Sequence, residues 1–158
     1  MAVWNYTDVP LAYLITFRSY GTWLHGDERG SVDRSHNRYG FPYIPANPQW
    51  EDYKRKALKS PPVKLRAKQR RSIEFAIRET CERRKWLLYA FNIRTNHVHS
   101  VVAIGDKKPE IALNAFKANA TRQMRADGCL SSSRSPWWIK AANADCGMSK
   151  VCSARSIT

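Results

Sequence analysis

The residues best placed to do chemistry are two histidines in the stretch Asn96-His97-Val98-His99, which lies among apolar residues. Successive side chains of an extended strand alternate between its faces, so His97 and His99 should point to the same side. Two imidazole nitrogens on one face can hold a divalent metal ion while Val98 packs on the other. The pattern predicts a metal site here, and two ordinary histidines on a solvated sheet are the alternative.

The segments around this pair are typical of a sheet. Residues 86–94 and 100–104 are rich in aromatic and β-branched side chains, and the break near Thr95 and Asn96 indicates an antiparallel hairpin. Residues 11–19 have the composition of a further, central strand. Residues 21–62 follow it and are rich in Gly, Pro, Asn and aromatic residues, so we expect a long ordered insertion.

Two helices are predicted on either side of the hairpin. The first spans residues 65–85, and the second begins near Pro109 and ends before Gly128. Their apolar stripes have helical spacing: Ile73, Ala76, Ile77, Thr80 and Cys81 in the first, and Leu113, Phe116, Ala120 and Met124 in the second. This order predicts an α+β fold, a ferredoxin-like antiparallel sheet with two helices on one face and a long insertion after the first strand. A further strand should complete the sheet, but the composition after residue 140 offers no clear candidate.

The chain carries a large excess of positive charge. Its 27 Lys and Arg against 13 Asp and Glu give a formal net charge of +14, which makes nucleic acid the first candidate partner and a membrane surface a weaker one. Fourteen basic residues but three acidic ones lie between positions 54 and 94. We expect DNA to be bound by Arg70, Arg71, Arg94, Lys117 and Arg122. Lys117 and Arg122 could reach a phosphate beside the histidines, or be solvated helix positions.

Length and composition limit the class of protein further. A chain of 158 residues suits one domain, here residues 1–140, followed by an aberrant, poorly ordered tail at 141–158. Because no apolar run reaches about 18 residues, we expect no membrane contact and a soluble cytoplasmic protein associated with the nucleoid. The four cysteines form no C-x-x-C pair, which favours free thiols over disulfides or a zinc knuckle.

Three segments in this order resemble the IS200-like transposases of the HUH type. They are Gly21-Thr-Trp-Leu-His-Gly-Asp with Gly30-Ser-Val-Asp-Arg34, then Asn96-His97-Val98-His99, then Lys117 with Thr121-Arg122. The likeness covers about residues 11–140, and its closest match is the branch of tyrosine transposases associated with repetitive extragenic palindromes. A single His-x-His is weak evidence, whereas three matching segments in the right order are fairly specific.

The resemblance implies metal-dependent transesterification of single-stranded or hairpin DNA. In that family the histidine pair, here His97 and His99, holds Mg²⁺ or Mn²⁺ as a Lewis acid against the scissile phosphate. A tyrosine on a C-terminal helix attacks the phosphorus and becomes joined to the DNA 5′ end, and a polar side chain on that helix, usually glutamine, completes the metal shell. Because some members form dimers, the resemblance also implies a homodimer or pairing with an intact relative.

The sequence departs from the family after its second helix. None of its tyrosines (Tyr6, Tyr13, Tyr20, Tyr39, Tyr43, Tyr53 and Tyr89) follows that helix, and Gln123 is the one glutamine beyond His99. We therefore expect the catalytic tyrosine to be missing and the domain to be inactive in cleavage. Residues 141–150, reverse-translated and read one base out of phase, permit a string similar to the family's Gly-Ser-x-Arg-x-Leu-Trp segment. A frameshift near Lys140 is our hypothesis, which the encoding DNA would test.

Two other functions stay open. One is a non-catalytic nucleic-acid-binding module built on a sheet with aromatic and basic residues. The other is a metal-dependent hydrolase that uses water, although Asp106 and Glu110, the nearby acids, sit at a helix start where acids are favoured anyway. Within the insertion, His25 and His36 are expected to be hydrogen-bonded loop residues, and the aromatic residues could stack on bases or pack against the sheet.

Overall fold

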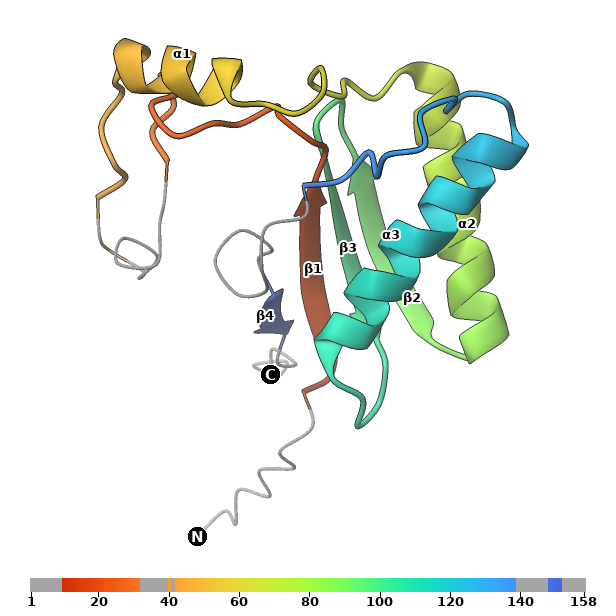
Figure 1. Ribbon diagram of the computed structural model, residues 1–158. Coiled ribbons are helices and arrows are strands. Elements are labelled where there is room, and N and C mark those ends of the chain that lie inside the picture. Colours follow the sequence, from red (N-terminus) through yellow and green to blue (C-terminus); the bar gives the residue numbers. More distant parts are fainter. Residues whose placement is uncertain (1–9, 32–39, 41, 139–147, 152–158) are drawn as a thin grey trace, which may run out of the picture.

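The computed structural model describes residues 10–31, 40, 42–138 and 148–151 (Figure 1). In these residues it has the elements β1 (Ala12–Arg18), α1 (Pro48–Lys56), α2 (Ala67–Arg84), β2 (Leu87–Ile93), β3 (His97–Ala103), α3 (Pro109–Ala126) and β4 (Met148–Val151). The strands form one antiparallel sheet in the order β2-β3-β1-β4, and α2 and α3 lie together on one side of it. The predicted α+β class with an antiparallel sheet is confirmed.

The core lies between the sheet and these two helices. Ile15 and Phe17 on β1 and Val98 and Val102 on β3 are fully buried, and they alternate with residues that are only partly buried. The opposite wall is formed by the predicted stripes of α2 and α3, whose residues are all buried: Ile73, Ala76, Ile77, Thr80, Cys81, Leu113, Phe116, Ala120 and Met124. The helical spacing in the sequence therefore identified the inner faces correctly.

The register of the sheet decides which residues share a face. Thr16 on β1 lies opposite His99 on β3, and Arg18 lies opposite His97. Directly opposed residues of an antiparallel pair point to the same side. Because Val98 faces the helices, these four side chains lie on the face that α2 and α3 leave uncovered.

The insertion is ordered in its described part and contains α1, which its Gly- and Pro-rich composition did not predict. Asn47 caps this helix through its Oδ1 atom, which accepts a hydrogen bond from the backbone N–H of Trp50 over 3.1 Å. Gly26 passes so close to this cap that a Cβ atom would lie 2.4 Å from the carbonyl oxygen of Asn47, and its φ is +93°. Only glycine combines that conformation with that approach.

The fourth strand lies within the range that the sequence assigned to a poorly ordered tail, 141–158. Met148–Val151 forms β4 and pairs with β1, with Ala12 opposite Val151 and Ile15 opposite Met148. The rest of that range lies outside the described residues. The strand was missed because such pairing uses backbone groups, and four residues carry too short a pattern to mark it.

Candidate metal and nucleic-acid site

His97 and His99 lie side by side on the uncovered face of the sheet. Their ring centroids are 4.6 Å apart with an angle of 66° between the ring planes, and both residues are half-buried. Val98 between them is fully buried against the helices. The predicted geometry, with both imidazoles on one face and the valine on the other, is confirmed.

Each imidazole is held in place through its Nδ1 atom. The Oδ1 atom of Asn96 accepts a hydrogen bond from Nδ1 of His97 over 2.7 Å, and the Oγ1 atom of Thr16 lies 2.7 Å from Nδ1 of His99. Outer contacts of this kind fix the tautomer and the ring orientation of metal-binding histidines. Because Oδ1 of Asn96 can only accept, Nδ1 of His97 carries the proton of the neutral ring and Nε2 keeps its lone pair; His99 offers Nε2 in the same way when the Thr16 hydroxyl accepts from its Nδ1.

The charge state of His97 also suits a ligand. Partial burial lowers the pKa of this imidazole below 6.5, and repulsion from the protonated form of His99, from Arg94 and from Arg29 lowers it further. The ring is therefore neutral at pH 7, which metal coordination requires.

The histidines supply two ligands and no more. Across the described residues, nowhere do three or more His, Cys, Asp or Glu side chains gather closely enough to enclose a metal ion. Mg²⁺ and Mn²⁺ prefer oxygen ligands and commonly retain water or bind substrate phosphate. Two imidazoles would supply part of the shell of such an ion, and within the described residues no third His, Cys, Asp or Glu ligand stands beside them.

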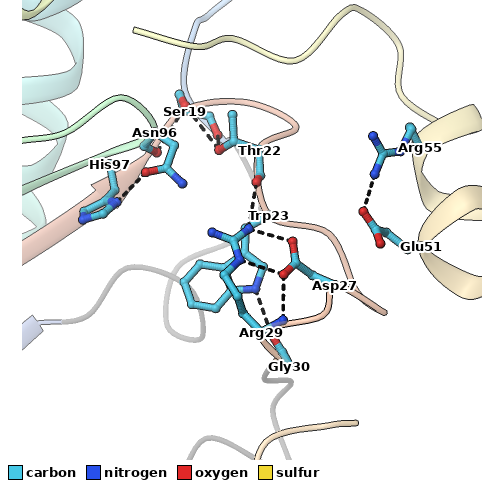
Figure 2. Close-up of polar contacts among 10 residues, drawn as sticks. All are labelled: Ser19, Thr22, Trp23, Asp27, Arg29, Gly30, Glu51, Arg55, Asn96 and His97. Carbon is cyan, nitrogen blue, oxygen red and sulfur yellow. Dashed lines mark hydrogen bonds and ion pairs between the residues drawn. The ribbon is translucent and has the colours of Figure 1, made fainter. Parts of the chain in front are cut away.

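A chain of hydrogen bonds joins the histidine hairpin to the start of the insertion (Figure 2). The backbone N–H and Oγ of Ser19 both donate to the carbonyl oxygen of Asn96, over 2.9 and 3.2 Å. Ser19 also contacts Thr22, whose carbonyl oxygen accepts a hydrogen bond from Nη2 of Arg29 over 3.3 Å. The insertion is thereby fixed beside His97, and it brings Arg29 with it.

Arg29 is oriented by an ion pair with Asp27. Its Nε and Nη2 atoms donate to the two carboxylate oxygens over 2.7 and 2.6 Å, and Arg29 keeps the pKa of that carboxyl below its usual range. The guanidinium carbon also lies 4.9 Å from the ring centroid of Trp23, and that of Arg18 lies 5.3 Å away. Trp23 and Asp27 lie in a segment that carries the family resemblance, but nothing in the sequence indicated that they, Arg18 and Arg29 would lie close to His97.

The five basic residues predicted to bind DNA do not form one site. Arg94 is exposed at the hairpin, where its backbone N–H bonds to the carbonyl oxygen of His97 and its charge lowers the pKa of that histidine. Arg70 and Arg71 lie near the start of α2, and Lys117 and Arg122 lie on α3. These four belong to the helical layer on the other side of the sheet. The expectation that Lys117 and Arg122 reach a phosphate held by the histidines stays a prediction.

None of the described tyrosines is in a position to attack a phosphate at the histidines. Tyr13 packs partly against the core, and Tyr20 pairs with Trp138 and accepts a hydrogen bond from the backbone N–H of Lys59. Tyr43, Tyr53 and Tyr89 are exposed, and none of the five has a hydrogen bond or ring contact to either histidine. Tyr6 and Tyr39 lie outside the described residues. Gln123 bonds to Asp127 at the end of α3 and is no ligand candidate.

The aromatic residues of the insertion are used mainly for packing in its described part. His25 stacks on Trp50 with the ring centroids 5.0 Å apart, and its Nδ1 lies 3.1 Å from Oγ of Ser31. His25 is thus the hydrogen-bonded loop histidine that the sequence predicted, whereas His36 lies outside the described residues. Tyr43 and Tyr53 remain exposed.

No protein-family model matches this chain, and no curated protein matches it. Within the described residues, the helices are all too short or too polar to cross a membrane.

Proposed function

We propose that this protein binds single-stranded or hairpin DNA through the uncovered face of its sheet, with Mg²⁺ or Mn²⁺ held by His97 and His99. One observation carries the proposal: the two imidazoles lie side by side, and Asn96 and Thr16 each contact the Nδ1 atom of one ring, so that Nε2 is the atom left to bind a ligand. An incidental pair of surface histidines would not need both contacts.

The arrangement of the elements supports a finer proposal, a ferredoxin-like domain of the IS200-like transposase type. Six elements follow in the order β1, α2, β2, β3, α3, β4, with both helices on one face and β1 and β3 adjacent at the centre. The histidine pair opens β3, where the resemblance in sequence places it. Localisation in the cytoplasm at the nucleoid, and a homodimer or a pairing with an intact relative, belong to the same proposal.

The basic residues around the pair favour a phosphate as the remaining partner. Arg29 and Arg94 lie close enough to affect the charge of His97, and within the described residues no carboxylate ligand stands beside the imidazoles. A cation bound here is stabilised by an anion that also neutralises the arginines, and a DNA phosphate is such an anion. The metal, when bound, supplies Lewis-acid stabilisation of charge on the phosphoryl oxygens.

Binding, rather than cleavage, is the activity proposed for this chain on its own. The described tyrosines have no contact with the histidines, and the sequence has no tyrosine after Tyr89. The imidazoles would hold the metal, and Arg29 and Arg94 would hold the DNA backbone. A nucleophile from a paired relative could act on the bound strand.

The decisive experiment measures Mn²⁺ and DNA binding in the same protein. Isothermal titration with Mn²⁺, in the presence of a single-stranded hairpin oligonucleotide, should give one site that disappears in the double variant H97A/H99A. The matched control is H25A, which removes a histidine from the insertion. Persistence of the site in the double variant would refute the proposal, and a covalent protein–DNA band on a denaturing gel would refute the restriction to binding.

A non-catalytic nucleic-acid-binding module remains the alternative. It is favoured by the +14 net charge, which needs no metal to attract a polyanion. If DNA affinity is the same with Mn²⁺ and with EDTA, and H97A/H99A leaves it unchanged, this alternative holds.

A further inference from the structure

A groove lies between α3 and the segment 133–138, which runs beside the end of β1 and bridges to it through Trp137 and Ser19. It has a volume of about 650 Å³, and its lining includes Lys117, Arg122 and Arg125 from α3 and Ser133, Ser135 and Trp138 from the facing segment. We call it the α3 groove. The function proposed above does not use it.

Positive charge dominates the α3 groove. Three cations line it, and no carboxylate among the described residues does. One acid, Glu79, lies 4.0 Å from Nη2 of Arg122 but makes a closer contact of 2.8 Å with Arg83. Because Lys117 and Arg125 are eight residues apart on one helix, the cations extend over about 12 Å along its axis. A row of that length suits an extended polyanion better than a single small anion.

The far wall of the groove is held rigidly against the helix. Nη2 of Arg125 donates to the carbonyl oxygens of Ser132 and Ser133 over 3.3 and 2.9 Å. Nζ of Lys117 donates to the carbonyl oxygen of Trp138 over 3.3 Å. The indole Nε1 of Trp137 bonds back to α3 at the carbonyl oxygen of Lys117 and at Oγ1 of Thr121, each over 3.0 Å. The groove is therefore preformed, and little ordering cost accompanies binding.

The chemistry of the lining selects the occupant. The side chain of Arg122 is 66% exposed, so its planar guanidinium can bind a phosphate with two parallel hydrogen bonds. Ser133 and Ser135 add neutral hydroxyl donors of the kind that contact phosphate and sugar oxygens. We propose that the α3 groove is a second nucleic-acid site, which holds the phosphate backbone of a single strand without metal and independently of the histidine pair.

The test measures the salt dependence of DNA binding in EDTA, so that no metal site contributes. Fluorescence anisotropy with a labelled single-stranded oligonucleotide compares the wild type with K117Q/R122Q and with K107Q/K108Q. The second variant is the matched control, because it removes the same charge from exposed lysines before α3. Two lost phosphate contacts should lower the slope of log K against log salt by about 1.4 in K117Q/R122Q, and the control should change it far less.

Three outcomes decide the question. An equal decrease of the slope in K117Q/R122Q and in K107Q/K108Q would mean that net charge alone attracts DNA, and it would overturn the proposal. Equally tight, groove-dependent binding of polyglutamate would overturn the choice of nucleic acid as occupant. Should the double variant fold poorly by circular dichroism, R122Q alone, at an exposed position, takes its place with an expected slope change of about 0.7. If the groove variants bind like wild type while Mn²⁺ binding still depends on the histidines, this inference fails and the proposed function stands.

Discussion

Thr16 and His99 lie directly opposite each other across β1 and β3, and Oγ1 of the threonine is 2.7 Å from Nδ1 of the histidine. The hydroxyl is on the uncovered face because its neighbours, Ile15 and Phe17, are buried on the other face. A strand that contributes to the core with alternate residues thus also orients a candidate metal ligand.

Replacing the threonine should weaken metal binding without unfolding the protein. T16V keeps the shape of the side chain but leaves His99 without its outer contact, so we expect the Mn²⁺ affinity to fall by about 10- to 100-fold. Titration calorimetry with the oligonucleotide present measures it. T95V, at an exposed position of the hairpin, is the control and should bind as wild type does. An unchanged affinity in T16V would show that the contact has no role in coordination.

The imidazole of His97 should titrate below pH 6.5. Burial is the largest cause that lowers its pKa, and repulsion from the protonated form of His99, from Arg94 and from Arg29 adds to the effect. R94Q removes one of those charges, so the midpoint should move upward in that variant. Two-dimensional NMR of the histidine ring protons follows both titrations in metal-free protein. A midpoint above 6.5 in the wild type would contradict the burial and the charges described here.

The Asp27–Arg29 pair should make stability depend on pH in the acid range. Because the folded pKa of Asp27 is lowered from 3.8, its contribution is present above that value and is lost as the pH falls through the folded pKa. D27N should cost about 1–2 kcal/mol of unfolding free energy at pH 7. Urea unfolding at pH 7 and pH 3 measures the free energy of unfolding of the wild type and of D27N. The difference between the two proteins should be smaller at pH 3, and an equal difference at both pH values would show that the charge of Asp27 does not contribute.

Trp137 should matter for stability through its ring and its N–H separately. The ring is 2% exposed and packs edge-on against Phe17 with centroids 4.9 Å apart, so W137A should cost about 3–5 kcal/mol. W137F keeps an aromatic ring but loses the bonds from Nε1 to α3, and about 1–3 kcal/mol is expected. Thermal unfolding measures both variants. If W137F were as damaging as W137A, the ring would not be the main contribution.

Gly26 should tolerate alanine much less than Gly105 does. Both have a positive φ, +93° and +68°, but a Cβ atom at Gly26 meets the backbone of Asn47 and Glu51, whereas at Gly105 nothing lies within 4 Å. G105A should therefore cost about 1 kcal/mol of conformational strain. G26A adds a clash with the start of α1 and should cost more. Chemical denaturation measures the free energy of unfolding of both variants. An equal decrease in G26A and G105A would mean that the insertion moves to make room for the added Cβ atom.

The sequence predicted those features that a local pattern encodes. The stripes Ile73–Cys81 and Leu113–Met124 repeat at helical spacing, and the alternation in His97-Val98-His99 correctly distinguished the two faces of β3. Both patterns arise because one face of the element is buried, which requires apolar residues at a regular spacing that can be seen in a single sequence.

The remaining features depend on pairings between distant positions, which a single sequence does not reveal. Thr16 is 83 residues from His99, and nothing near position 16 indicates that its hydroxyl will meet an imidazole. Arg29 reaches the site because the insertion is bound to the hairpin through Ser19 and Asn96. Lys117 and Arg122 were grouped with the histidines by their charge and by the segment they share with the family, and the structure places them on α3, in the helical layer. Charge in a sequence indicates a kind of partner but not the surface that meets it.

The position of Trp137 links the stability of the core to the shape of a surface groove, two properties that are usually separable. Its ring completes the core beside Phe17, and its N–H fastens the segment that forms the far wall of the α3 groove. A chain shortened before this residue would lose core packing and the wall of the α3 groove, the proposed second nucleic-acid site, in the same step. Selection to keep the domain folded would then also preserve the proposed binding surface.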